Sequence, residues 1–258
     1  MRRLSLIYSL STWVALGLCG QTLAADAPIP AAITSAVADT ARPDADTARD
    51  VNRKPAEVLA FVGVKPGDKV ADYMAGSGYF TRLFSDVVGA EGHVYAVEPS
   101  EVMGFKSAPE TLGTLGAWAN KHANTSLMVA EALDAVKYPD SLDIFWISQN
   151  YHDLHDKFMG PVDLAKFNKA VFKALKPGGL YIVLDHAAAK GAAMEVTETL
   201  HRIDPETVKK EVEAAGFELV SESKVLANPA DDHSLKVFDP SLRGKTDQFI
   251  YKFRKPKK

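Results

Sequence analysis

Hydrophobic and polar positions follow two alternating periods along this chain. Short apolar runs bounded by turn residues predict buried strands, whereas apolar residues at intervals of three and four predict helices. The predicted strands occupy residues 69–75, 92–99, 125–133, 141–154 and 180–186. The predicted helices occupy residues 55–64, 78–89, 100–122 and 162–175. Strands and helices that alternate at this spacing indicate a parallel sheet with right-handed crossovers.

The C-terminal part departs from this alternation. Residues 204–217 predict a capped helix, and two strands, at 218–226 and 246–255, follow with only a loop between them. Such a pair forms an antiparallel hairpin at one edge of the sheet. Of the 258 residues, 47% are hydrophobic, which is enough to bury one sizeable core. The expected fold is a single doubly wound α/β domain with a mostly parallel sheet.

The N-terminal residues have the pattern of a signal peptide. Arg2 and Arg3 precede an apolar run, and small residues then allow cleavage after Ala24, although an uncleaved anchor stays open. Residues 25–50, rich in Ala, Pro, Asp and Thr, are expected to form a mobile arm or a short helix over the domain at 51–258. We therefore expect a periplasmic or secreted protein without a membrane-spanning segment after cleavage.

Charge and cysteine usage narrow the class of partner. The formal net charge of −3 is small and both signs are mixed along the chain, so no nucleic-acid partner is expected. The single cysteine, Cys19, lies within the predicted signal peptide. The mature chain would then have no disulfide and no thiolate metal site. A small-molecule partner is expected, and the sequence predicts no oligomeric state.

A glycine loop follows the strand at 69–75, where ligands bind in open α/β sheets. Gly76 and Gly78 allow the backbone to approach a ligand closely. Asp72 can accept a hydrogen bond from a ligand amine. Glu98 ends the next strand, twenty residues beyond Gly78, where an acid meets the two ribose hydroxyls of a nucleoside. This pattern favours a nucleoside site.

Three other glycine motifs are excluded by the same stretch. A P-loop is excluded because no Gly-Lys-Ser/Thr follows. A dinucleotide site requires Gly or Ala three positions after Gly78, where the chain has Thr81, preceded by bulky Tyr79 and Phe80. The sequence "AGSGY" also lacks the spacing of a nucleophile elbow.

Five motifs together resemble a known family. The stretches "VADYMAGSGYFT", "VYAVEP", "AEAL", "DIFWISQNYHD" and "LKPGGLYIVLDH" resemble class I S-adenosylmethionine-dependent methyltransferases, and more closely a bacterial group of predicted methyltransferases with signal peptides. The resemblance covers residues from about 50 to 255. It implies a seven-stranded sheet with an antiparallel last strand, and S-adenosylmethionine as cofactor.

The resemblance also implies roles for individual residues. Asp72 and the backbone of Ala75, Gly76, Ser77 and Gly78 would surround the amino acid part of the cofactor. Glu98 would bind its ribose, and Glu131 with Ala132 would meet the adenine amino group. Met74 departs from the family, which usually has glycine there. A backbone contact survives that change if the φ angle of Met74 is negative, and the side chain can equally point into the core.

The polar run "QNYHDLHD" at 149–156 is expected to face the transferred methyl group. Methyl transfer from a sulfonium is an in-line displacement that mainly needs alignment. His152 is the candidate base, with Asp153 orienting it and Tyr151 positioning the substrate. Asn150 is a candidate for contacting cofactor or substrate.

Several structural roles compete with these assignments. His152 can be a packing residue and Asp153 a helix cap. Asp185 and His186 form a second candidate pair on the same rim. The histidines and aspartates of 152–156 are residue types that bind metals. Their spacing matches no known closed metal site, so no metal is predicted.

The expected function is methyl transfer from S-adenosylmethionine to a small molecule. The competing hypothesis is an exported, non-catalytic protein that binds a nucleoside or another small ligand and has kept the methyltransferase fold. Export motivates this alternative, because the space outside the cytoplasm has no obvious supply of the cofactor and fold does not fix function. A planar or apolar acceptor is favoured by the aromatic residues Tyr73, Tyr79, Phe80 and Tyr151.

Overall fold

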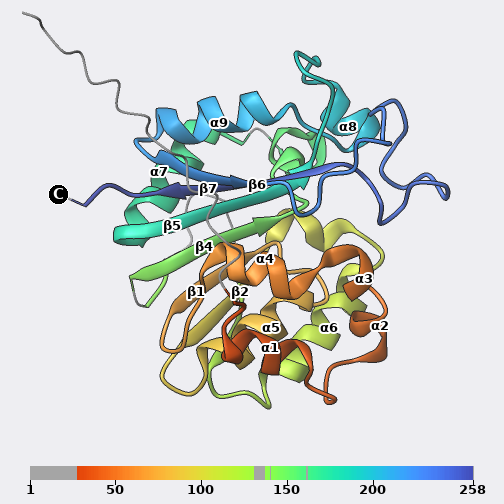
Figure 1. Ribbon diagram of the computed structural model, residues 1–258. Helices are drawn as coiled ribbons and strands as arrows, with labels where there is room; N and C mark the ends of the chain where they lie inside the picture. Colours follow the sequence, from red (N-terminus) through yellow and green to blue (C-terminus); the bar gives the residue numbers. More distant parts are fainter. Residues whose placement is uncertain (1–27, 131–136, 140, 161, 258) are drawn as a thin grey trace, which may run out of the picture.

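A central sheet of seven strands organises the chain (Figure 1). The computed structural model describes residues 28–130, 137–139, 141–160 and 162–257. The strands are β1 (Lys69–Tyr73), β2 (His93–Pro99), β3 (Thr125–Ala130), β4 (Leu142–Ser148), β5 (Leu175–His186), β6 (Glu218–Ser223) and β7 (Gln248–Arg254). Their order is β3-β2-β1-β4-β5-β7-β6. β7 runs antiparallel to both β5 and β6, whereas the pairs among β1 to β5 are parallel.

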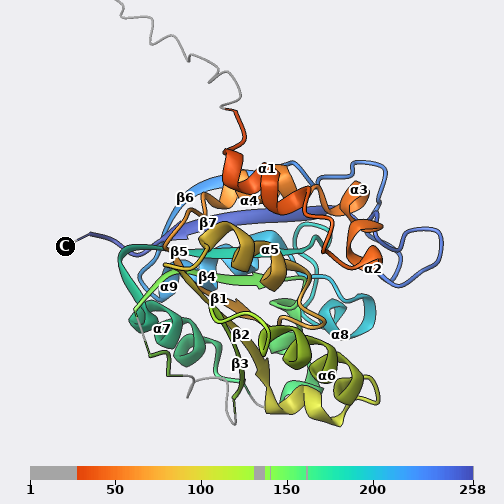
Figure 2. The same cartoon turned by 90° about the horizontal axis from the view of Figure 1, so that it is seen from below.

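Helices cover both faces of this sheet. The α-helices are α1 (Ala31–Val37), α2 (Asp44–Thr47), α3 (Asp50–Arg53), α4 (Pro55–Val62), α5 (Tyr79–Val88), α6 (Ala108–Ala119), α7 (Leu164–Ala174), α8 (Val196–Leu200) and α9 (Pro205–Ala214). In the described residues, the short 3₁₀ helices are η1 (Ser100–Gly104), η2 (His152–His155) and η3 (Lys157–Met159). Figures 1 and 2 show α1, α4 and α5 on one side of the sheet and α7 and α9 on the other. The predicted doubly wound α/β fold, with its antiparallel terminal strands, is confirmed.

The central strand β4 explains why the core has two layers. Ile144 and Trp146 point to the face covered by α1, α4 and α5, and Phe145 and Ile147 point to the opposite face. All four side chains are at most 2% exposed. A parallel strand covered on both faces has no polar side, which is why its sequence reads as a continuous apolar run.

Local signals set the helix ends. Pro55 opens α4, and Pro205 opens α9 behind Asp204, whose carboxylate accepts a hydrogen bond from the backbone N–H of Glu206. Gly78 precedes α5 with a φ of 85°. These residues are the ones from which the sequence predicts the helices.

Residues 28–53 pack against the domain. Ile33 of α1 is fully buried among residues of α4 and α5. Asp46 of α2 forms an ion pair of 2.6 Å with Arg82 of α5, and Arg42 forms one of 2.7 Å with Asp50. This segment forms helices, as one of our two alternatives expected, and is held in place rather than free. The predicted signal peptide, residues 1–24, lies outside the described residues. Within the described part of the chain, no helix is long and apolar enough to cross a membrane.

Candidate active site

The glycine loop lies between the end of β1 and the start of α5, at the carboxyl edge of the parallel strands. Gly76 and Gly78 have φ angles of 58° and 85°, in the left-handed region that favours glycine. A Cβ atom on Gly78 would lie 2.7 Å from a side-chain carbon of Leu115. The backbone N–H of Gly76 donates a hydrogen bond to the Glu98 carboxylate at the end of β2. Glu98 therefore holds the loop in place.

Met74 does not have the negative φ angle on which an unchanged backbone contact depends. Its φ is 57°, so the condition for keeping an unchanged backbone contact is not met. A left-handed conformation costs a residue with a Cβ roughly 1–2 kcal/mol. The backbone N–H of Met74 donates to the carbonyl of Val97 at 2.8 Å, and its side chain packs partly against the core. The loop thus keeps the conformation that suits glycine, although methionine occupies this position.

A cavity of about 130 Å³ lies over the loop. Its described lining includes Asp72, Ala75, Gly76 and Ser77 together with two cations from the N-terminal segment, Arg49 before α3 and Arg53 in α3. Asp72 accepts a hydrogen bond from Thr81 at 2.6 Å, and Arg53 donates one to Gln149 at 3.1 Å. An acid and two guanidinium groups around one small cavity complement a zwitterionic amino acid.

Burial changes the charge of this cavity. It raises the pKa of Asp72 to about 7 and that of Glu98 to about 8, because the charged carboxylate loses its hydration. Burial also lowers the pKa of Arg53 to about 10. Near neutral pH, the Glu98 carboxyl is therefore mostly protonated in the ligand-free protein.

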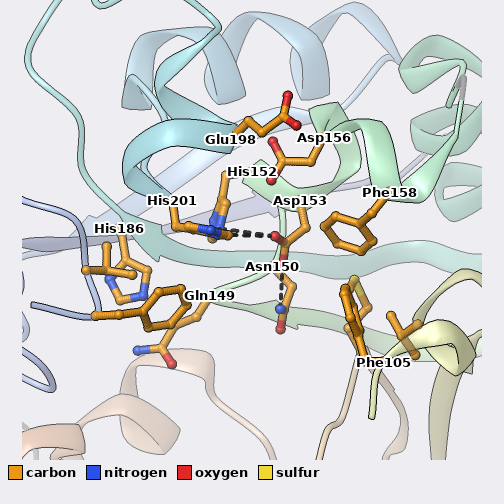
Figure 3. A pocket seen from close by; sticks show the side chains of 14 residues that line it. Phe105, Gln149, Asn150, His152, Asp153, Asp156, Phe158, His186, Glu198 and His201 are labelled. Atoms are coloured by element: carbon orange, nitrogen blue, oxygen red, sulfur yellow. Dashed lines mark hydrogen bonds and ion pairs between the residues drawn. The ribbon is translucent and has the colours of Figure 1, made fainter. Parts of the chain in front are cut away.

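A second cavity of about 660 Å³ adjoins the first, and both are lined by Met74, Gln149 and Asn150. Phe105 and Phe158, whose ring centroids are 5.0 Å apart, line one side of it (Figure 3). Besides Gln149 and Asn150, the polar lining includes His152, Asp153, Asp156, His186, Glu198 and His201. This cavity can hold a flat, partly apolar molecule against a polar wall.

His152 is 2% exposed and lies at the centre of the polar wall. Its Nδ1 lies 2.8 Å from Oδ1 of Asp185, and Oδ2 of Asp185 accepts a hydrogen bond from the His152 backbone N–H. Oδ1 of Asp153 lies 3.3 Å from Nε2, the other ring nitrogen. Asp185 therefore holds the ring more closely than Asp153 does, and it joins the two candidate clusters of the rim. The orienting role of Asp153 stays a prediction.

Two of the three histidines in this polar wall, His152 and His186, differ in charge. Burial disfavours the imidazolium of His152, but the charge and hydrogen bond of Asp185, with a smaller contribution from Asp153, raise the pKa of His152 to about 9. Burial lowers the pKa of His186 to about 4. At pH 7 one ring is cationic and the other neutral.

Tyr151 corrects another expectation. It is fully buried, and its hydroxyl donates to Glu211 at 2.9 Å and accepts from Asn168. Because these contacts hold the ring in the core, Tyr151 does not position a substrate. Tyr73 is likewise a core residue, and the aromatic wall of the larger cavity comes from other residues.

Asn150 lines both cavities and donates a hydrogen bond of 2.8 Å to Oδ2 of Asp153. Asp153 lines the larger cavity rather than capping a long helix. Glu131 and Ala132, predicted to meet the adenine, lie outside the described residues. Their roles stay predictions.

Sequence reasoning assigned no role in the site to Arg53 or His201. Arg49 and Arg53 stand four residues apart, a spacing that puts both on one side of a helical turn, but they fall in and beside a segment expected to be an arm. His201 ends α8, a helix absent from the predicted elements, and no local motif marks it.

The fold and the loop define a class of protein. The residues present fit S-adenosylmethionine, because the small cavity offers both an acid and guanidinium groups for its amino acid part, and Glu98 ends the strand beside it. Chains of this fold are found among solved methyltransferase structures. An S-adenosylmethionine-dependent methyltransferase from Aquifex aeolicus matches with a TM-score of 0.58 and 21% identity over 82% of this chain and 95% of that one. An arsenic(III) S-adenosylmethionine methyltransferase from Chlamydomonas reinhardtii matches with a TM-score of 0.54 and 18% identity over 90% and 75% of the two chains.

The chain belongs to the ubiE/COQ5 methyltransferase family, whose sequence model matches residues 50–207. S-adenosylmethionine is the cofactor of this class of methyltransferase. Ubiquinone/menaquinone biosynthesis C-methyltransferase UbiE of Pasteurella multocida is 32% identical over 124 residues, 48% of this chain and 41% of the relative. The protein of that name from Pseudoalteromonas translucida is 29% identical over 194 residues, 74% of this chain and 66% of the relative. The match thus spans less than two thirds of each of these relatives.

Proposed function

We propose that this protein transfers a methyl group from S-adenosylmethionine to a small, planar acceptor that carries a hydroxyl group. The observation that carries the proposal is the pair of adjoining cavities that share Met74, Gln149 and Asn150. Transfer from a sulfonium requires donor and acceptor to be close and aligned, and adjoining cavities at one sheet edge provide that arrangement.

The residues divide between the two partners of the reaction. Asp72, Arg53 and the loop backbone would hold the amino acid part of the cofactor, and Glu98 its ribose. Phe105 and Phe158 would pack against the acceptor ring, while the polar wall with His152 faces its hydroxyl group. The cofactor supplies an electrophilic methyl group. In C-methylation, which the names of the relatives state, an acceptor carbon gains the methyl group, loses a proton, and S-adenosylhomocysteine is left.

Calorimetric titration tests the first half of the proposal. S-adenosylmethionine and S-adenosylhomocysteine should both bind the purified protein at one site. If neither produces heat or a thermal shift, the methyltransferase proposal fails.

Transfer of radiolabelled methyl to phenols and hydroquinones tests the second half. Label in such an acceptor supports the proposed acceptor class. Cofactor binding without transfer to any acceptor, including those of a cell extract, would favour the alternative of a binding protein that lost catalysis. One observation favours that alternative: the Met74 side chain lies where both cavities meet.

We also propose that the protein is exported and acts in the periplasm or outside the cell. The supporting feature is the arginine pair before the apolar run, with cleavage after Ala24. Mass spectrometry of the protein recovered from a periplasmic extract should find Ala25 at its N-terminus. Full-length protein found only in the cytosol would contradict the proposal.

A further inference from the structure

Three side chains of the larger cavity bring their ligand atoms together (Figure 3). Nε2 of His152 lies 3.4 Å from Nδ1 of His201 and 3.3 Å from Oδ1 of Asp153. The third side of this triangle, from His201 Nδ1 to Asp153 Oδ1, is 3.7 Å. His201 comes from the end of α8, far along the chain from η2, so only the tertiary fold completes the group.

The triangle has the dimensions of a metal-binding face. Zinc binds histidine nitrogen at about 2.0–2.1 Å and carboxylate oxygen at about 2.0–2.2 Å, so neighbouring ligands of a tetrahedral ion lie roughly 3.3–3.5 Å apart. Two sides of the triangle fall in that range and the third exceeds it by about 0.2 Å. A small rotation of one side chain would close the difference.

Surrounding hydrogen bonds fix two of the three ligands. The other ring nitrogen of His152 faces the Asp185 carboxylate at 2.8 Å, and Asp185 is fully buried. Metal-binding histidines almost always donate their second N–H to such a partner. Asn150 holds the second oxygen of Asp153 at 2.8 Å, which leaves Oδ1 as the ligand atom.

A neighbouring carboxylate gives a separate indication. Asp156 is 2% exposed and lines the same cavity, yet its Oδ1 has no hydrogen-bond partner among the described residues. A buried carboxylate oxygen without a partner is costly, and a bound cation or its water ligands would relieve that cost.

We propose that His152, Asp153 and His201 bind a divalent transition-metal ion, with Zn²⁺ as the expected occupant. Two imidazoles and one carboxylate suit such an ion better than Mg²⁺ or Ca²⁺, which prefer oxygen ligands. Three protein ligands leave at least one coordination position open, and all three residues line the acceptor cavity.

The role of this ion depends on the proposed function, whereas its binding does not. The open position would take the hydroxyl oxygen of the acceptor and favour its deprotonated form, with the proton released to solvent. His152 would then act as a ligand, with its Nε2 proton displaced to solvent as the ion binds. It would not act as the base that the sequence predicted, since a coordinated Nε2 cannot accept a proton.

Titration of the chelator-treated protein with Zn²⁺ alone tests the site. One equivalent should bind, and Co²⁺ in its place should give the intense visible absorption of a tetrahedral ion with nitrogen ligands. His201→Ala and Asp153→Asn should each weaken binding more than about 100-fold, as expected for loss of one of three ligands.

His155→Ala is the matched control. His155 belongs to the same 3₁₀ helix, but its Nε2 lies 3.2 Å from Glu211 and does not join the triangle. This variant should bind one equivalent with unchanged affinity. Absence of stoichiometric binding to the wild type, an octahedral Co²⁺ spectrum, or binding that persists in both ligand variants would overturn the proposal. The wild-type spectrum decides the question even if a variant fails to fold.

Asp185→Asn tests the positioning residue. Stoichiometry should stay at one ion while affinity falls about 10- to 100-fold. A role in folding alone would lower the melting temperature and leave the affinity unchanged. Zinc titrations omit S-adenosylmethionine and cofactor titrations contain chelator. Failure of one binding event is therefore distinguishable from failure of the other.

Discussion

The two adjoining cavities are built in different ways. The smaller one is formed mainly by residues of the single stretch from Asp72 to Phe80, with residues 148–150 and the two N-terminal arginines added. The larger one gathers side chains from η1, the loop after β4, the end of β5, α8 and the segment near Phe238. The proposed cofactor cavity thus comes mainly from one local motif, whereas the proposed acceptor cavity is assembled from distant segments.

The two cavities also differ in what shifts the pKa values of their titratable groups. In the smaller cavity, burial dominates and raises the pKa of Asp72 and Glu98. In the larger cavity, His152 has Asp185 and Asp153 within hydrogen-bond or ion-pair distance, and these neighbours outweigh burial. Burial therefore determines the protonation of the carboxyl groups in the smaller cavity, whereas neighbouring carboxylates determine that of His152 in the larger one.

Loss of the Glu98 carboxylate should have the largest effect on the smaller cavity. Glu98→Ala removes the predicted ribose contact and the loop anchor, and hydrogen bonds of a carboxylate contribute about 1.5–3 kcal/mol each. S-adenosylhomocysteine affinity should fall more than about 100-fold by calorimetry. Zn²⁺ affinity should not change. Equal loss of cofactor binding in His201→Ala would break the division between the cavities.

Arg53→Met should weaken S-adenosylhomocysteine about 10-fold, because the guanidinium group no longer faces the ligand carboxylate. 5′-Methylthioadenosine lacks the amino acid part, so its affinity should stay the same. Lys54→Met is the control, since Lys54 bonds the carbonyl of Val225 instead. An equal loss for both ligands would show that Arg53 acts only on the fold.

The raised pKa of Glu98 also implies that the free energy of unfolding depends on pH. Its pKa is near 4.5 in the unfolded chain and about 8 in the folded one, so the folded state keeps the proton up to a higher pH. The stability from this group is complete below pH 4.5 and is lost as the pH rises through 8. The contribution of Glu98 to the free energy of unfolding of the ligand-free protein should fall by about 3 kcal/mol between pH 5 and pH 8 in urea titrations. Glu98→Gln should reduce this dependence and leave the part that comes from the raised pKa of Asp72; an unchanged slope would contradict the prediction.

Met74→Gly should have the smallest effect. It relieves a left-handed φ angle and opens the wall between the cavities, so cofactor affinity should rise a few-fold. Met74→Leu, which keeps the bulk and the strain, should bind as the wild type does. Weaker binding by the glycine variant would show that the methionine side chain contacts the cofactor.

Much of the fold could be predicted from the sequence because its signals are local. The apolar run of β4 marks a strand covered on both faces, and Pro55 and Pro205 mark helix starts. Gly76, Gly78 and Glu98 mark the cofactor loop for the same reason, since a strand and its exit loop are continuous in the chain. α8 was missed because it has only five residues and little periodicity.

The sequence by itself determined the order of strands and helices, the glycine loop, and the family to which the chain belongs. Only the tertiary structure decided which polar side chains meet. It buried Tyr151 in the core, placed Asp185 against His152, and brought His201 beside both His152 and Asp153. The physical reason is that backbone periodicity is set by near neighbours, whereas side-chain contacts depend on how distant segments pack over the sheet.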